Sequence, residues 1–402
     1  MKIQKAYKTE LAPNKTQVVL LAKSVGTARF AYNWGLARRK EEYEKTGKSS
    51  NAIEQHRQLN ALKDSDFPWM REVSKCSPQE ALKDLDKAYE NFFRRVKKGE
   101  KAGYPKFKSK NDAKQSCRLT GSIHVESDRV KLPRIGRVRL KENDYIPVGC
   151  KPLSATISKR ADRWFVSILV EEEISPVQNI EGRVVGIDLG IRNLAVTSDN
   201  VVFMNPKALN KNIDKLARLE RKKSRQVKGS NNRKKTVRKI QRLYFRISNI
   251  RQDTIHQMTT AVVKAKPRLV VIEDLNVKGM MKNRKLSRSV ADVCFGEIRR
   301  QFKYKSLWNG FEVQVADRWF SSSKMCSGCG HIKVELSLSE RTFICPECGL
   351  VIDRDLNASF NLEKYPTLSS RGSYACGDEC SKACRKPVKR KKQELKTTEI
   401  CA

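Results

Sequence analysis

Acidic residues and histidines are scarce in this chain. Its 402 residues include 83 Lys and Arg, 44 Asp and Glu and only 4 His, so the formal net charge is +39. Such an excess destabilises a compact fold through self-repulsion unless a polyanion offsets it. A small-molecule enzyme has no need of this charge, whereas a protein that lies along nucleic acid does. The charge balance therefore predicts a nucleic-acid partner.

Long apolar runs are missing too. No apolar stretch approaches the roughly 18 residues of a membrane-spanning helix. The first fifteen residues are basic but lack the apolar core of a signal peptide. Twelve cysteines are too few for a disulfide scaffold in a chain of this length, so paired thiols point to metal binding. We therefore expect a cytoplasmic protein that has no membrane partner.

Changes in residue periodicity divide the first part of the chain. Residues 3–11 alternate as a strand, residues 13–103 have apolar positions at helical spacing, and short β-rich segments with turn residues follow. We expect a small β-barrel or sheet formed by residues 1–12 and 104–180, with residues 13–103 as an inserted helical module. Ser77 and Pro78 form a suitable N-cap and first-turn pair, so one helix is expected to start there.

The second part predicts a mixed α/β domain over residues 181–320. Three strands fall within residues 182–205, a helical hairpin within 205–250, and a strand–helix–strand pattern within 268–316. A cysteine-rich segment, residues 321–352, precedes a last helix, residues 353–368. Residues 369–402 form a basic tail that we expect to be flexible. Its thiols Cys376, Cys380 and Cys384 are spaced as a helical stripe or are incidental.

Two CxxC pairs, Cys326 with Cys329 and Cys345 with Cys348, are separated by fifteen residues. This spacing predicts a closed, tetrahedral four-thiolate site for one structural Zn²⁺. The alternative, a reduced redox pair, fits poorly because redox CxxC motifs occur singly near the start of a βαβ unit. Such a ribbon either touches nucleic acid or serves only as a scaffold.

Three carboxylates lie next to apolar segments, where an unpaired charge is energetically unfavourable. Asp188 and Glu273 each end an apolar strand, and Asp355 begins the last helix. Alone, each acid is adequately explained as a loop or cap residue. Together they suit two Mg²⁺ ions, one to activate the attacking water and one to stabilise the leaving oxygen of a phosphodiester. Asp353 is the rival of Asp355 or the cap of that helix, and strand alternation turns Asp274 away from Glu273.

Other catalytic machinery is not visible in the sequence. We find no nucleophilic Ser or Cys with a matching His, and the four histidines form no cluster. Between residues 221 and 246 there are twelve Lys or Arg and no acid, which favours a phosphate backbone as partner. A second basic run includes aromatic residues suited to base stacking. The candidate nucleic-acid contacts are Arg221, Lys222, Lys223, Arg225, Arg233, Lys234, Lys235, Arg238, Lys239, Tyr104, Lys106, Phe107 and Lys108.

These residues together resemble one family. Asp188 within GIDLG, Glu273 within VVIEDL, and a CSGCG–CPECG ribbon followed by DRDLNAS are similar to the TnpB proteins of bacterial insertion sequences, which are ancestral to the type V CRISPR effector nucleases. Residues 29–33 (RFAYN), 103–108 (GYPKFK) and 320–326 (FSSSKMC) are similar to that family too. The resemblance covers roughly residues 1–365.

The resemblance implies a RuvC-like RNase H fold with an inserted zinc ribbon, and an oligonucleotide-binding-type β-barrel with an inserted helical recognition module. It implies a prokaryotic, RNA-guided endonuclease that cleaves double-stranded DNA beside a transposon-adjacent motif, with one protein per guide RNA from the transposon end. Asp188, Glu273 and Asp355 then take the catalytic, Mg²⁺-binding roles. Two alternatives remain open: a transposase that transfers strands in DNA recombination, and a non-catalytic nucleic-acid-binding regulator.

Overall fold

The computed structural model describes residues 2–110, 115–173, 181–337 and 339–370. The chain forms two compact units, Met1–Pro176 with Ala208–Ile250, and Val177–Lys207 with Arg251–Ala402. The basic tail predicted beyond residue 370, with Cys376, Cys380 and Cys384, lies outside the described residues. Every helix in the described part of the chain is too short or too polar to span a lipid bilayer.

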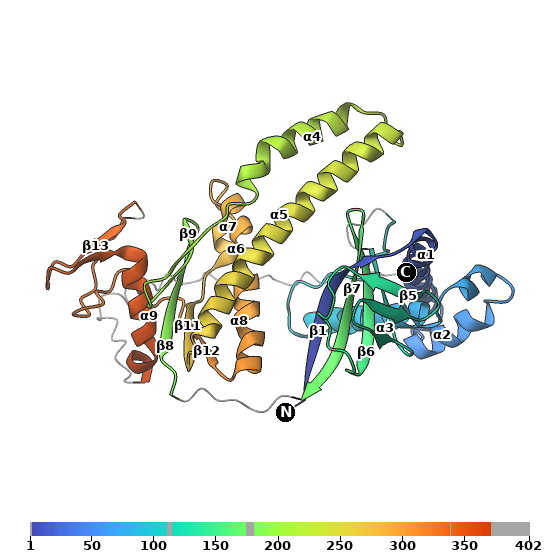
Figure 1. Cartoon of the computed structure of the whole chain (residues 1–402), viewed down its shortest axis with the longest axis horizontal. Coiled ribbons are helices and arrows are strands. Elements are labelled where there is room, and N and C mark those ends of the chain that lie inside the picture. Colours follow the sequence, from blue (N-terminus) through green and yellow to red (C-terminus); the bar gives the residue numbers. More distant parts are fainter. Residues whose placement is uncertain (1, 111–114, 174–180, 338, 371–402) are drawn as a thin grey trace, which may run out of the picture. The chain divides into compact units, whose positions relative to one another are not determined.

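The first unit contains a seven-stranded antiparallel sheet in the order β2-β6-β7-β1-β5-β4-β3. The first strand pairs with both β7 and β5, so the chain leaves this sheet for a helical segment and then returns; Figure 1 shows β1 beside β7. The strand β2 was not foreseen from the sequence. The bounds are β1 (Lys2–Ala12), β2 (Gln115–Leu119), β3 (His124–Val125), β4 (Arg129–Leu132), β5 (Gly136–Leu140), β6 (Pro152–Arg160) and β7 (Arg163–Glu173).

The helices between β1 and β2 are α1 (Lys15–Thr46), α2 (Ala52–Ala61), the short 3-10 helix η1 (Pro68–Glu72) and α3 (Cys76–Lys97). Asn14 caps α1, because its side chain accepts a hydrogen bond from the N–H of Gln17 at 2.8 Å. The predicted cap of α3 is wrong. That helix already begins at Cys76, and the hydroxyl of Ser77 donates instead to the carbonyl of Ser24 in α1 at 2.7 Å.

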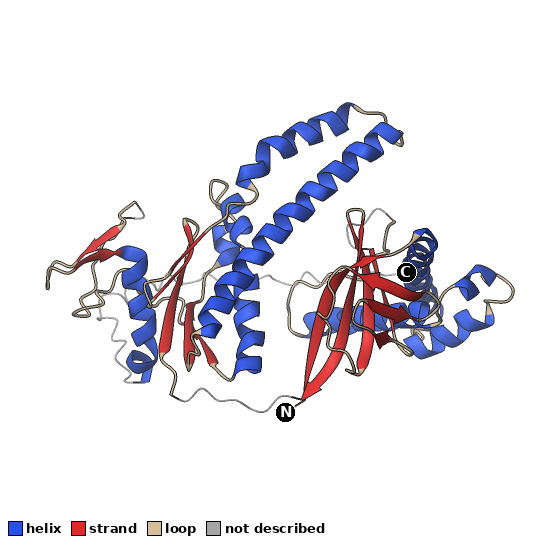
Figure 2. Cartoon of the chain, in the orientation of Figure 1, coloured by secondary structure: helices blue, strands red, loops and turns tan. Residues whose placement is uncertain are grey.

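The predicted helical hairpin is confirmed as α4 (Ile213–Arg225), preceded by one 3-10 turn η2 (Asn210–Asn212), and α5 (Asn231–Lys264) (Figure 2). Leu216 and Leu219 of α4 pack against Leu243 and Ile247 of α5. The hairpin thus buries a narrow apolar seam and leaves its remaining surface to charged residues. The division between the two units falls within α5, after Ile250.

The second unit contains a five-stranded sheet in the order β10-β9-β8-β11-β12. Its strands are β8 (Val184–Leu189), β9 (Asn193–Thr197), β10 (Val202–Met204), β11 (Leu269–Glu273) and β12 (Glu312–Ala316). The first three are antiparallel, whereas β11 runs parallel to both β8 and β12. Parallel strands buried on both faces read as continuous apolar runs, which is why β8 and β11 were predictable.

The helices of this unit are α6 (Val277–Met280), α7 (Ser287–Val293), α8 (Phe295–Asn309) and α9 (Arg354–Ser370). The sequence did not predict α6 and α7. A two-stranded ribbon of β13 (Thr342–Ile344) and β14 (Val351–Asp353) precedes α9.

In α8, the buried amine of Lys305 donates to the hydroxyls of Thr259 and Thr260 at 2.7 Å each, and burial lowers the pKa of Lys305 to about 8.

Candidate active site and metal centre

Two of the predicted acids lie at one edge of the second unit's sheet. The parallel strands β8 and β11 are in register up to Ile187 and Ile272, and Asp188 and Glu273 are the next residue of each strand. Because parallel strands end on the same side of a sheet, both side chains meet there. Each carboxylate is part-buried rather than fully solvated. The two apolar strands therefore place Asp188 and Glu273 next to each other at this edge of the sheet.

Helix α9 brings Asp355 to this edge. It packs directly on β8 because Gly186 has no side chain: a Cβ there would lie 2.0 Å from the carbonyl oxygen of Ser359 and 2.4 Å from the amide nitrogen of Glu363. Asp353 is the cap of this helix, since its side chain accepts hydrogen bonds from the N–H groups of Asp355 at 2.9 Å and Leu356 at 3.1 Å.

The three acids interact electrostatically. Burial, then the charges of Glu273 and Asp355, raise the pKa of Asp188 well above its usual range. Burial also raises the pKa of Glu273, with a further contribution from Asp355, while a hydrogen bond from Ser322 lowers it in part. Mutual repulsion among part-buried carboxylates is relieved when a cation binds between them. Their all-oxygen donor set fits Mg²⁺.

Asp274, next to Glu273, has a different role. Its carboxylate forms ion pairs with Arg299 at 3.2 Å and with Arg318 at 2.5 Å. The expectation that strand alternation separates it from Glu273 agrees with these contacts. Glu273 instead accepts a short hydrogen bond from the hydroxyl of Ser322, which the sequence analysis included in the motif of residues 320–326 but not among the site residues.

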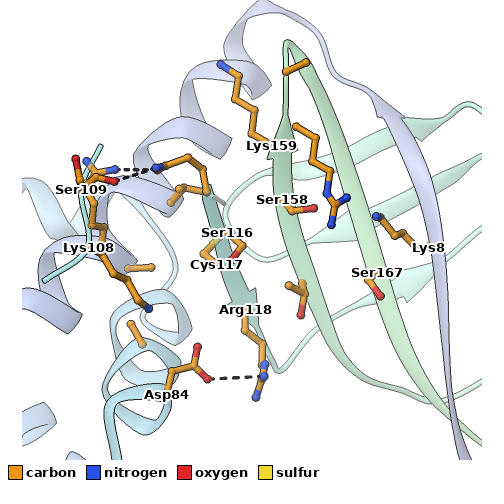
Figure 3. Close-up of a pocket in the computed structure, with 18 of the residues that line it drawn as sticks. Lys8, Asp84, Lys108, Ser109, Ser116, Cys117, Arg118, Ser158, Lys159 and Ser167 are labelled. Atoms are coloured by element: carbon orange, nitrogen blue, oxygen red, sulfur yellow. Dashed lines mark hydrogen bonds and ion pairs between the residues drawn. The ribbon is translucent and has the colours of Figure 1, made fainter. Parts of the chain in front are cut away.

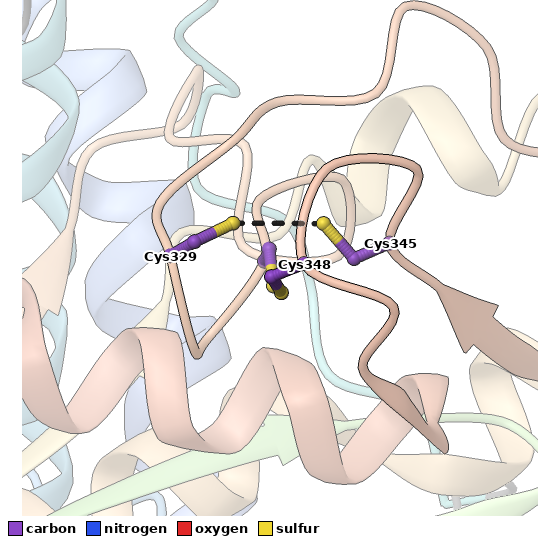
Figure 4. A group of neighbouring side chains, drawn as sticks. Cys329, Cys345 and Cys348 are labelled. Atoms are coloured by element: carbon purple, nitrogen blue, oxygen red, sulfur yellow. Dashed lines mark hydrogen bonds between the residues drawn. The ribbon is translucent and has the colours of Figure 1, made fainter.

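The four predicted cysteine ligands converge. The sulfur atoms of Cys326, Cys329, Cys345 and Cys348 all lie within 4.8 Å of one another, with 3.6 Å between Cys326 and Cys348 and 3.5 Å between Cys329 and Cys345 (Figure 4). A tetrahedral site with Zn–S bonds of about 2.3 Å has sulfur–sulfur edges of about 3.8 Å. The four cysteines thus form a site that can hold one metal ion, and its dimensions fit Zn²⁺.

The two knuckles of this site share one backbone design. The N–H of Gly330 donates to the carbonyl of Cys326 at 2.9 Å, and the N–H of Gly349 donates to the carbonyl of Cys345 at 3.1 Å. Both glycines adopt positive φ, 82° and 70°, a conformation that disfavours side chains. The sequence position of each glycine, directly after the second cysteine of its pair, therefore follows from the turn.

Most of the basic residues predicted on the hairpin share its exposed surface, but Lys223 and Arg233 are part-buried, and the amine of Lys223 pairs with Glu220. Arg221, Lys222 and Arg225 lie on α4 next to one another and line a shallow hollow with Arg218 and Gln226. The guanidinium of Arg233 instead donates to the carbonyls of Lys223 and of Gln226, the latter at 3.1 Å, and so holds the end of α4. The other predicted hairpin contacts are Lys234, Lys235, Arg238 and Lys239, which are exposed on α5.

The second basic run packs against the helical segment. The amide side chain of Asn33 donates to the carbonyl of Lys108 at 2.9 Å and accepts from its N–H at 2.8 Å. The Lys108 amine lies 3.7 Å from the ring centroid of Tyr32. Tyr104 and Phe107 remain 43% and 54% exposed, and Lys106 is exposed beside them. Both rings keep an exposed part, while the hydroxyl of Tyr104 bonds that of Tyr89 and the Lys40 amine lies 5.5 Å and 5.2 Å from the ring centroids of Tyr104 and Phe107.

A cavity of about 820 Å³ lies within the first unit (Figure 3). Strands β1, β2, β6 and β7, helices α1 and α3, and residues 241–248 of α5 contribute to its wall. Among the described residues of its wall the cations outnumber the acids: Asp84 is the one acid, and it pairs with Arg118 at 3.8 Å. The cations are Lys8, Arg29, Lys108, Arg118, Lys159 and Arg160, and several serine hydroxyls accompany them. Sequence reasoning missed this cavity because its wall is made of segments that are far apart in the chain.

The chain is similar to known proteins over nearly its whole length. Family models match residues 1–48 ("Helix-turn-helix domain"), 167–284 ("Probable transposase") and 295–362 ("Cas12f1-like, TNB domain"). Within the first match the structure has one strand and one 32-residue helix. The "Putative RNA-guided DNA endonuclease" of Streptomyces pristinaespiralis is 34% identical over 97% of both chains. InsQ of Escherichia coli, named in the same words, is 34% identical over 98% of this chain and 99% of its own.

The chain belongs to the TnpB family. The fold comparison agrees with that membership. A chain of the structure titled "Cryo-EM structure of the Cas12f1-sgRNA-target DNA complex" has a TM-score of 0.53 at 14% identity and covers 90% of this TnpB chain and 99% of its own length. The mixed α/β multidomain architecture expected from the sequence is thereby shown at the level of the fold.

Proposed function

We propose that this TnpB protein is an RNA-guided, Mg²⁺-dependent DNA endonuclease of a mobile element, which hydrolyses phosphodiesters beside a transposon-adjacent motif. Two relatives similar over nearly their full lengths are named "Putative RNA-guided DNA endonuclease", which supports the RNA-guided cleavage of DNA. The observation that carries the proposal is the convergence of Asp188, Glu273 and Asp355 at one sheet edge, on a chain with a net charge of +39.

In this proposal Asp188, Glu273 and Asp355 hold two Mg²⁺ ions. Mg²⁺ held there supplies the positive charge that activates an attacking water and stabilises the leaving oxygen. The protein contributes the placement of the ligands: β8 and β11 fix two carboxylates by their register, and Gly186 admits α9 with the third. The five-stranded sheet with β11 and β12 parallel to β8 supports assigning this unit to the RuvC-like RNase H class.

The four cysteines hold one Zn²⁺ as a closed structural site, since four thiolates leave no position open to substrate. The seven-stranded sheet of the first unit takes the role of the oligonucleotide-binding-type barrel, and α1 to α3 that of the recognition module. These assignments follow the domain boundaries that we expect from the sequence.

The nucleic-acid partners are a guide RNA from the transposon end and double-stranded target DNA, with one protein per RNA. The exposed cations of the hairpin support binding to a phosphate backbone. The cationic cavity of the first unit supports a second place for phosphate or nucleotide groups. Exposed Tyr104 and Phe107 supply rings on which bases stack.

The test is cleavage of a target by the full chain purified with its RNA, with that RNA sequenced to define the target. We expect Mg²⁺-dependent cleavage that leaves 5′-phosphate ends. Asp188→Ala removes cleavage and keeps RNA binding, whereas Asp214→Ala, on the exposed surface of α4, keeps both. Strand-transfer products would support the transposase alternative, and nucleic-acid binding without any cleavage would support the regulator.

A further inference from the structure

A buried serine contacts the carboxylate site from the loop that joins β12 to the cysteine ribbon. Ser322 is 4% exposed, and its hydroxyl donates to Oε1 of Glu273. Oε2 is thereby left for a cation. A hydroxyl fixed in this way restricts the rotation of the carboxylate. Without such a contact, a Glu side chain is flexible and its carboxylate has no fixed orientation. The orientation of Glu273 therefore depends on where the backbone of Ser322 lies.

Two asparagines of α9 hold that backbone in place. The side-chain amide of Asn361, 1% exposed, donates to the carbonyls of Ser322 at 2.7 Å and Met325 at 2.6 Å. One turn earlier, the fully buried Asn357 donates to the same Met325 carbonyl at 2.7 Å and accepts from the N–H of Ser327 at 2.9 Å. These bonds fasten the Ser322–Ser327 segment to the helix that carries Asp355.

The same segment contains the first ligand of the four-cysteine site. Cys326 follows Met325 directly, and its N–H donates to the carbonyl of His331 at 2.8 Å. A metal bound by Cys326 and Cys345, with the other two thiolates, would lock this end of the segment. Few contacts join the four-cysteine site to Glu273: Cys326 is bonded to Met325, Asn361 donates to the carbonyls of Met325 and Ser322, and Ser322 donates to Glu273.

We propose that Ser322 is a positioning residue for the carboxylate site, and that the metal-loaded ribbon sets its place through Asn361. Metal at the cysteines then raises the affinity of the acidic site for its divalent cation. By reciprocity, a cation at the acids stabilises the metal-loaded ribbon. The inference rests on the proposed function in one respect, namely that Glu273 binds a divalent cation.

The expected size of the effect follows from comparable sites. Removing a group that orients a metal ligand typically weakens metal affinity by about 10–100-fold. Ser322→Ala removes only the hydroxyl and adds no volume, so the packing around it is preserved. Ser323→Ala is the matched control, because Ser323 is the adjacent, part-exposed residue of the same loop and no side-chain contact of it is part of the path described above.

The experiment measures Mn²⁺ binding to the full chain by electron paramagnetic resonance, without DNA, with zinc content and circular dichroism recorded for each variant. Mn²⁺ shares the oxygen-ligand preference of Mg²⁺. We expect Ser322→Ala to keep its zinc and helix content and to bind Mn²⁺ about 10–100-fold more weakly. Ser323→Ala is expected to match the unsubstituted chain, and Asp188→Ala defines binding outside the acidic site.

A second arm needs no substitution, so it decides the matter even if Ser322→Ala fails to fold. Zinc is removed from the unsubstituted chain by dialysis, and the Mn²⁺ titration is repeated. We expect the zinc-free unsubstituted chain to lose Mn²⁺ affinity to a similar extent. If Ser322→Ala is folded, removing its zinc should lower its Mn²⁺ affinity little further, because coupled changes are not additive. Unchanged Mn²⁺ affinity in either arm, or fully additive losses, would overturn the inference. If Asp188→Ala binds Mn²⁺ like the unsubstituted chain, the proposed function fails instead.

Discussion

The close packing of α9 on β8 gives a sharp test of how the acidic site is assembled. Gly186→Ala places a methyl group 2.0 Å from the Ser359 carbonyl oxygen and 2.9 Å from the carbonyl carbon of Leu362, where ordinary contact begins at 3.4 Å. Both atoms belong to the helix backbone, so no side-chain rotation relieves the clash. The helix must therefore move away from the strand by about 1 Å or more.

That displacement acts on Asp355, which lies one turn before Ser359 on the same helix. A misplacement of about 1 Å in a catalytic group can lower a rate about 100-fold. Overpacking of a core costs about 1–3 kcal/mol of stability. We therefore expect Gly186→Ala to remain folded with a lowered melting temperature, and to cleave target DNA about 100-fold more slowly at saturating Mg²⁺ and guide RNA.

The assay compares single-turnover cleavage rates and thermal unfolding of the unsubstituted chain, Gly186→Ala and Gly296→Ala. Gly296 lies in the first turn of α8, and an added Cβ there meets nothing within 4 Å, so this control should cleave normally. A Gly186→Ala chain that cleaves at the unsubstituted rate would show that Asp355 need not sit where α9 places it, and the reasoning would be refuted.

Three further outcomes are expected. Replacing both Lys234 and Lys235 by Gln should weaken RNA or DNA binding at low salt. It should also reduce the slope of the logarithm of the binding constant against the logarithm of the salt concentration by roughly 1 for each lysine that neutralises a phosphate. An unchanged slope would contradict the assignment of the hairpin as an interface. Cys345→Ser should lower the zinc content measured by mass spectrometry, and retained stoichiometric zinc would contradict the four-thiolate site. Between pH 8 and 10 the unfolding free energy of the unsubstituted chain should rise relative to that of Lys305→Met. The reason is that the pKa of Lys305 is about 8 in the folded chain and 10.5 in the unfolded chain, so the unfolded chain binds more protons in this range. Urea denaturation at several pH values measures the difference, and parallel pH profiles for the two chains would contradict the prediction.

Sequence reasoning located the acidic site because burial and charge conflict there. The apolar runs before Asp188 and Glu273 predicted two strands with an acid near the end of each, and the structure shows that these strands are parallel neighbours. The cysteine spacing was equally informative, since two CxxC pairs leave few alternatives to a shared metal site. In each case a few residue types in a fixed pattern carry the physical constraint.

Other features left no such pattern. The residue pattern alone left Asp353 and Asp355 as rivals, and the assignment to Asp355 came from the family resemblance; the structure adds the two N–H bonds that make Asp353 the cap. Ser322 stands among three consecutive serines, and nothing in the residue type distinguishes the one that reaches Glu273. Helices α6 and α7, of four and seven residues, are too short to show two turns of apolar periodicity. Contacts between segments far apart in the chain decide such details.

The order of the ligands along the chain has a consequence for synthesis. The strands that carry the first two acids are complete by residue 273, but the third acid follows the cysteine ribbon at residue 355. A ribosome that stops anywhere before that point releases a polypeptide with an incomplete cation pocket. In the proposed function, a fragment that ends before residue 355 would therefore lack the third metal ligand and would not cleave DNA.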